Sequence, residues 1–166
     1  MERQYPPFGQ IPGLVPGDHQ LQARTPHTAV NLSAFFGSAD GVLATVWTAT
    51  TAPELQGVDF SFEQLTATSV YGHLTIWADV DPVPNLPSAP VAANLASGGR
   101  GQDAGLDFRS YTLWFPVELD IIVTAVRFTL AWPEAGIENK VMLLHRSQLV
   151  AAADKAIDLT PPTAGS

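Results

Sequence analysis

The chain has 166 residues and no cysteine, and its 8 cations against 16 carboxylates give a net charge of −8. A chain of this length forms one domain and buries a sizeable core without disulfides, and thiolate chemistry is excluded. The acidic balance argues against nucleic acid as a partner, because phosphate binding needs a basic patch. Charged residues make up only 14% of the chain, which leaves more uncharged surface for protein contacts than usual.

The N-terminal segment MERQYPPFGQ contains no apolar core after Arg3, and no apolar run in the chain is long enough to span a membrane. We therefore expect no signal peptide and no membrane association. The absence of cysteine fits a reducing compartment, so the expected location is cytoplasmic.

Residues 1–20 alternate prolines and glycines with apolar residues. Proline fixes φ and removes a backbone donor, so this stretch is expected to be an extended arm rather than a helix or a sheet strand. A disordered tail is the alternative. An arm that lies in a groove, on its own domain or on a neighbour, is favoured by the spacing of the apolar residues Phe8, Ile11, Leu14 and Val15.

Alternation of apolar and polar residues predicts several strands, with a hairpin turn at 37–41. The predicted strands are 28–36, 42–51, 58–62, 69–80, 106–115 and 119–132. The last two are close enough in sequence to form an antiparallel hairpin. The segment ENKVMLLH at 138–145 is either a final strand or the approach to a helix.

The predicted strand 119–132 is the element around which the domain is organised. Its core face carries Ile122, Thr124, Val126, Phe128, Leu130 and Trp132. The opposite face begins with Ile121, Val123 and Ala125, which is too apolar for a face open to water. We therefore expect another element, or a neighbouring subunit, to cover it.

Residues 81–105 are rich in Pro, Gly, Ala and Ser, which predicts a long loop that binds, acts as a lid or is disordered. Ser147 is a plausible N-cap, and the alanine-rich segment after it predicts a helix over 147–157. The predicted fold is all-β: an antiparallel β-sandwich of about six to seven strands with one C-terminal helix. This domain spans 21–160, with a tail at 161–166, and a partly open barrel is the alternative.

Four stretches carry a resemblance to known proteins: IPGLVP at 11–16, QART at 22–25, SGGRG at 97–101 and AWPEAGIE at 131–138. Over nearly its whole length the chain resembles a group of small uncharacterised proteins of high-GC Gram-positive bacteria. The resemblance implies a single domain and carries no activity, cofactor or site residue. The chain departs from the group at Thr160, where an aromatic residue is expected, and its helix lacks the usual arginines.

No catalytic, cofactor or metal site is predicted. The four histidines, His19, His27, His73 and His145, show no metal-ligand spacing, and the pair Asp79 and Asp81 is too common a pattern to indicate calcium. Nucleophile-elbow, HExxH and phosphate-binding motifs are missing from the sequence. An enzyme that uses His73 with Asp79 or Asp81 is therefore the least favoured reading.

Outward-facing aromatic residues form the candidate binding surface, since Trp and Tyr anchor interfaces and stack on sugars. Its residues are Tyr71, His73 and Trp77, joined by Trp47 and Tyr111 if their side chains point the same way. Cover by the 81–105 loop or by the N-terminal arm is the structural alternative.

The predicted function is a non-enzymatic structural or protein-interaction module within an oligomeric assembly, so the expected partner is another protein or a second copy. The alternative is a ligand-binding β-sandwich, with carbohydrate as the ligand. The candidate interface comprises Phe8, Ile11, Leu14, Val15, Ile121 and Val123.

Overall fold

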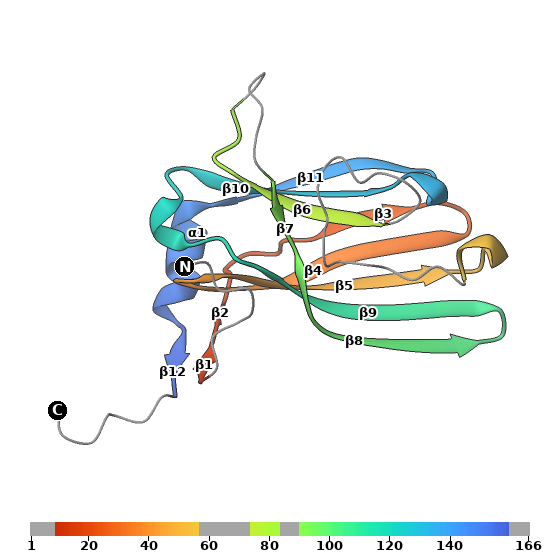
Figure 1. Cartoon of the computed structure of the whole chain (residues 1–166), viewed down its shortest axis with the longest axis horizontal. Coiled ribbons are helices and arrows are strands. Elements are labelled where there is room, and N and C mark those ends of the chain that lie inside the picture. The colour runs from red at the N-terminus through yellow and green to blue at the C-terminus, as the bar shows by residue number, and fades with distance from the viewer. Residues whose placement is uncertain (1–8, 57–73, 84–89, 160–166) are drawn as a thin grey trace.

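The computed structural model describes residues 9–56, 74–83 and 90–159 (Figure 1). These residues form two large antiparallel sheets, a small two-stranded sheet and one α-helix near the C-terminal end. The protein is therefore all-β with a C-terminal helix, as the sequence predicts.

The larger sheet has six strands in the order β2-β4-β5-β9-β8, and β3 also pairs with β4. The strands are β2 (Gly13–Leu14), β3 (Leu21–Arg24), β4 (Thr28–Ser38), β5 (Gly41–Thr50), β8 (Asn94–Asp103) and β9 (Leu106–Phe115). The predicted hairpin is confirmed, because β4 pairs with β5 up to the register partners Ser38 and Gly41. A short 3₁₀ helix, η1 (Pro53–Leu55), follows β5.

The second sheet has four strands in the order β11-β10-β6-β7. The strands are β6 (Thr75–Val80), β7 (Val91–Ala92), β10 (Ala125–Trp132) and β11 (Ile137–His145). At one edge the chain runs from β7 through the fully buried Ala93 into β8 of the larger sheet. At the other edge β11 contacts β3, so the two sheets meet along both sides (Figure 1).

The hydrophobic core lies between the two sheets. The predicted core face of β10 is confirmed, because Val126, Phe128, Leu130 and Trp132 are all fully buried. The Phe128 ring meets Phe35 of β4 at a centroid distance of 5.1 Å and Phe115 of β9 at 5.0 Å. Because these ring contacts join the four-stranded sheet to the six-stranded sheet, they fix how the two layers face each other.

The predicted strand 119–132 is too long at its start. Leu119–Ile121 is a 3₁₀ helix, η2, and β10 begins only at Ala125. The predicted hairpin between 106–115 and 119–132 is also wrong, because β9 pairs with β5 and β8 whereas β10 pairs with β6 and β11. Pro116 and η2 thus carry the chain from one sheet to the other.

The prediction of a long loop over 81–105 is wrong for its described part. Residues 91–92 and 94–103 are the strands β7 and β8, and β8 forms a hairpin with β9. The turn of this hairpin uses two left-handed residues, Ala104 with φ 49° and Gly105 with φ 82°. The predicted strand 58–62 and the start of 69–80 lie outside the described residues.

The single described α-helix, α1, spans Arg146–Asp154, slightly earlier than the predicted 147–157. It begins before the predicted N-cap Ser147, because His145 takes the N-cap position and its backbone N–H donates to Gln148 Oε1 at 2.9 Å. The last predicted residue, Ile157, belongs instead to the strand β12 (Ile157–Asp158). A third 3₁₀ helix, η3 (Pro133–Ala135), links β10 to β11.

The N-terminal segment lies against the domain in its described part. Gln10–Ile11 forms β1, which pairs with β12, and β2 pairs with the edge of β4. The backbone of Gly13 packs directly against Ala152 of α1, where a Cβ at position 13 would overlap the Ala152 carbonyl oxygen. The described segment therefore docks on its own domain, which is one of the two favoured alternatives, but the prediction that it avoids sheet structure is wrong.

Candidate functional site

The structure does not bring the predicted aromatic surface together. Trp47 points outward from the six-stranded sheet, whereas Tyr111 lies on the inner face of the same sheet and packs against the core. Trp77 lies between the fully buried Ile76 and Ala78, so it faces outward from the four-stranded sheet. Trp47 and Trp77 are therefore on opposite sides of the molecule, and Tyr71 and His73 lie outside the described residues.

A shallow groove of about 460 Å³ crosses the outer face of the six-stranded sheet over β3, β4, β5 and β9. Its aromatic part is a pair that joins Trp47 of β5 to Phe108 of β9, with ring centroids 5.2 Å apart and planes tilted by 48°. Trp47 is 43% exposed and Phe108 is 40% exposed. The residues that line the groove are Gln22, Ala23, Arg24, Ala29, Val30, Asn31, Trp47, Thr48, Ala49 and Phe108.

Asn31 supplies an unusual polar atom to this groove. It lies opposite Trp47 in the β4–β5 pair and opposite Gln22 in the β3–β4 pair. Its Oδ1 atom is buried and has no hydrogen-bond partner among the described residues. A buried acceptor without a partner costs free energy, and because this atom is closed off from solvent, a molecule in the groove can reach it only when the side chains that cover it move.

A second surface is formed by both ends of the described chain. Ile11 of β1 lies directly opposite Ile157 of β12, and the Leu159 N–H donates to the Gly9 carbonyl at 2.6 Å. The side chains of Ile11, Ile157 and Leu159 are 50%, 53% and 59% exposed. We call these three residues the terminal patch; it lies near α1, far from the β8–β9 turn (Figure 1).

The other residues of the candidate interface divide into exposed and buried ones. Leu14 and Ile121 are exposed, and Val123 is 79% exposed. Val15 is buried and belongs to the core, so it is not available as an interface residue, while Phe8 lies outside the described residues. On the same predicted face Ala125, Thr129 and Ala131 are buried, so that part is covered within the chain, whereas cover of Ile121 and Val123 by a neighbouring subunit stays a prediction.

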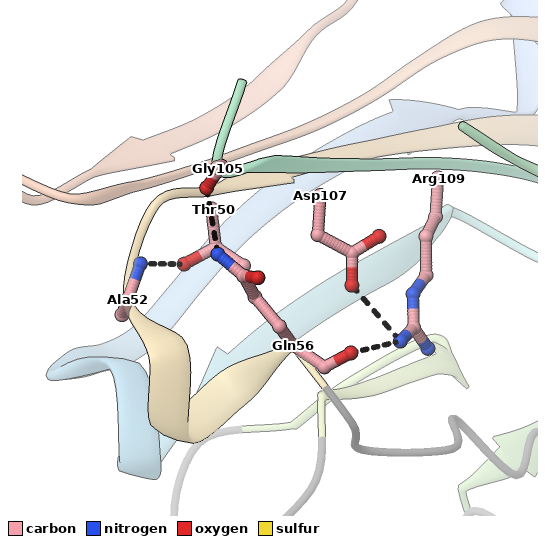
Figure 2. Close-up of polar contacts among 6 residues, drawn as sticks. All are labelled: Thr50, Ala52, Gln56, Gly105, Asp107 and Arg109. Carbon is pink, nitrogen blue, oxygen red and sulfur yellow. Dashed lines mark hydrogen bonds and ion pairs between the residues drawn. The ribbon is translucent and has the colours of Figure 1, made fainter. Parts of the chain in front are cut away.

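A polar cluster of mostly buried groups stands beside the β8–β9 turn (Figure 2). Asp107 Oδ2 pairs with Arg109 Nη2 at 3.2 Å, and both side chains are almost completely buried. Arg109 also donates to the Gln56 carbonyl at 3.4 Å, and Gln56 Nε2 donates to the Gly105 carbonyl at 2.7 Å. The cluster ties the segment after η1 to the hairpin turn, which is a structural role.

Two acidic residues near β6 have structural partners. Asp79 pairs with Arg127 at 3.0 Å. Asp81 accepts hydrogen bonds from the backbone N–H groups of Val123, Thr124 and Ala125 at 2.8, 2.6 and 3.0 Å. The hydrogen bond from Val123, with those from the next two residues, lowers the pKa of Asp81 in spite of its partial desolvation.

The described residues contain no group of three or more His, Asp or Glu side chains placed to hold a metal ion. His19 Nε2 lies 3.0 Å from the Pro16 carbonyl and 3.0 Å from Gln148 Nε2, so it links the segment after β2 to α1. His73, the histidine considered for an enzyme, lies outside the described residues.

Sequence reasoning missed Asn31, Phe108, Ile157 and Leu159. In β9 the usual pattern of apolar residues inside and polar residues outside is reversed, because Asp107 and Arg109 point inward and Phe108 points outward. Alternation alone therefore indicates the strand but assigns Phe108 to the wrong face. Ile157 is hidden from sequence reasoning by its position after an alanine-rich helical stretch. The unpartnered amide of Asn31 leaves no trace in a sequence.

Comparisons of the chain with protein-family models, with curated proteins and with solved structures found no match. The resemblance to small proteins of high-GC Gram-positive bacteria therefore stays a prediction. Within the described residues, no helix has the length and apolar character needed to cross a membrane.

Proposed function

We propose that this protein is a non-enzymatic, cytoplasmic interaction module that assembles with a second copy of itself through the terminal patch. The observation that carries the proposal is the pairing of Ile11 with Ile157, which places large apolar side chains from both chain ends on one exposed surface. Clusters of exposed apolar side chains on a soluble domain commonly mark protein contacts. Because the exposed side chains of the terminal patch are apolar, the surface of a partner that covers them is expected to be apolar as well.

The small size of the β1–β12 sheet supports the same proposal. Its two strands contain two residues each, and an isolated two-stranded sheet is at best marginally stable in water. Burial of Ile11, Ile157 and Leu159 against a second copy removes apolar area from water and stabilises the paired strands. A two-fold contact of this kind is self-complementary, because the same patch is present on both copies.

Light scattering coupled to size-exclusion chromatography tests the proposal with two matched double variants. Ile11→Ser/Ile157→Ser removes two of the three apolar side chains of the terminal patch. Ile121→Ser/Val123→Ser makes the same chemical change at exposed residues elsewhere. We expect the first variant to be monomeric and the second to keep the wild-type mass. Loss of assembly only in the second variant would instead place the interface at Ile121 and Val123.

A further inference from the structure

We propose that the groove on the outer face of the six-stranded sheet binds a neutral carbohydrate of one or two sugar rings. This site is separate from the terminal patch, and neither proposal depends on the other. The proposal rests on three features of the groove: its aromatic platform, its unpartnered amide and its charge. Its volume of about 460 Å³ falls in the range of small-molecule sites in proteins.

The aromatic platform suits a sugar ring. Trp47 and Phe108 are both exposed and lie 5.2 Å apart between ring centroids. A pyranose presents C–H groups on one face and hydroxyls at its rim, so it stacks its apolar face on an aromatic ring and leaves its hydroxyls free to hydrogen-bond. The tilt of 48° between the two rings makes a bent platform rather than a flat one.

The amide of Asn31 supplies the matching polar contact. Its Oδ1 atom is buried beside Trp47 and lacks a partner within the described residues. When a sugar displaces the side chains that cover this atom, its hydroxyl donates to the acceptor, while the hydroxyl oxygen accepts from a neighbouring group. Gln22 and Arg24, which line the same groove, supply such donors from β3.

The charge of the groove favours a neutral ligand over an anionic one. Among the described lining residues Arg24 is the single cation and there is no carboxylate. A phosphate or nucleic-acid ligand calls for several cations, and the chain carries a net charge of −8. An extended peptide is also disfavoured, because the groove lies on the face of central strands whose backbone groups are already paired.

An array of immobilised neutral glycans, followed by titration of the strongest binder with detection by NMR chemical shifts, tests the proposal. We expect wild-type protein to bind and the amide signals of β4, β5 and β9 to shift. Trp47→Ala and Asn31→Ala should each weaken binding by about tenfold or more, while the control Leu143→Ala, on β11 of the other sheet, should bind as wild type does. Circular dichroism establishes that each variant is folded.

Three results would overturn the proposal. The first is a wild-type protein that gives no signal on the array. The second is equal binding by wild type and by folded Trp47→Ala, which would place any sugar elsewhere. The third is binding of a library of extended peptides, with no neutral glycan bound, which would assign the groove to a protein ligand.

Discussion

The ring of Tyr111 lies over the backbone of its cross-strand partner Gly98, so closely that a Cβ at position 98 would stand 2.6 Å from Tyr111 Cδ1. β8 is the outermost strand of the six-stranded sheet, and this contact holds it against β9. The absence of a side chain at position 98 is thus required by packing.

Gly98→Ala should therefore lower the free energy of unfolding by about 1–3 kcal/mol, because the new methyl group forces the Tyr111 ring to move. Gly99 is the matched control, since a Cβ there meets nothing within 4 Å. Gly99→Ala should be neutral or stabilise by up to about 1 kcal/mol, because alanine loses less backbone entropy on folding. Urea denaturation measures both, and equal effects would show that the Tyr111 contact is unimportant.

The buried pair Asp107 and Arg109 should behave as a unit. Removing one partner leaves the other charge buried without its ionic partner, which typically costs about 3–5 kcal/mol. We expect Asp107→Asn and Arg109→Met each to be strongly destabilising, and the double variant to be less destabilised than the sum of the two. Chemical denaturation of the four proteins gives the coupling free energy, and additive effects would contradict a direct interaction.

The pKa of Asp81 is lowered by its three backbone hydrogen bonds, which gives a defined pH dependence. A carboxyl group whose pKa is lower in the folded state than in the unfolded state stabilises the fold above its unfolded pKa. That contribution is lost as the pH falls from about 4 through the folded pKa. The stability of wild type should therefore drop over this acidic range.

The substitution Asp81→Asn should make the loss of stability at acidic pH smaller than it is in wild type. Asparagine keeps the shape and tolerates the left-handed backbone at position 81, where φ is 46°, but its amide has one acceptor oxygen instead of two. We expect a loss of about 1 kcal/mol at neutral pH, a value reduced by solvent screening at this exposed site. Asp120→Asn, on the exposed side of η2, is the control, and an unchanged acid profile in Asp81→Asn would refute the assignment.

Salt should strengthen assembly through the terminal patch. Two copies that each carry a charge of −8 repel one another, and added salt screens this repulsion while leaving apolar contacts intact. The association constant measured by sedimentation should therefore rise between low and physiological ionic strength. A fall would indicate that ion pairs, rather than Ile11, Ile157 and Leu159, hold the copies together.

The parts of the fold that sequence predicts well are those where side-chain alternation is strong. The core face of β10 and the β4–β5 hairpin follow from large apolar residues at every second position. β8 is missed because its glycines and small residues give no alternation, and its strand structure depends on pairing with β9. The pairing of β10 with β6 rather than β9 is likewise decided by tertiary packing.

The candidate sites show the same division. Alternation in β5 predicts that the Trp47 side chain points outward. In β9 the charged residues Asp107 and Arg109 lie on the same face as Tyr111, and that face points inward because the two charges are buried as an ion pair. The terminal patch joins residues from opposite ends of the chain, and no local pattern predicts that Ile11 meets Ile157. The groove depends on the register that places Asn31 opposite Trp47, which is a property of the folded sheet.

Sedimentation equilibrium of the wild-type chain over rising protein concentration tests self-assembly most directly. The proposal predicts a molar mass that climbs above the 17.7 kDa of one chain and returns to that value in Ile11→Ser/Ile157→Ser. A wild-type mass that stays at 17.7 kDa from low to high micromolar concentration would contradict it.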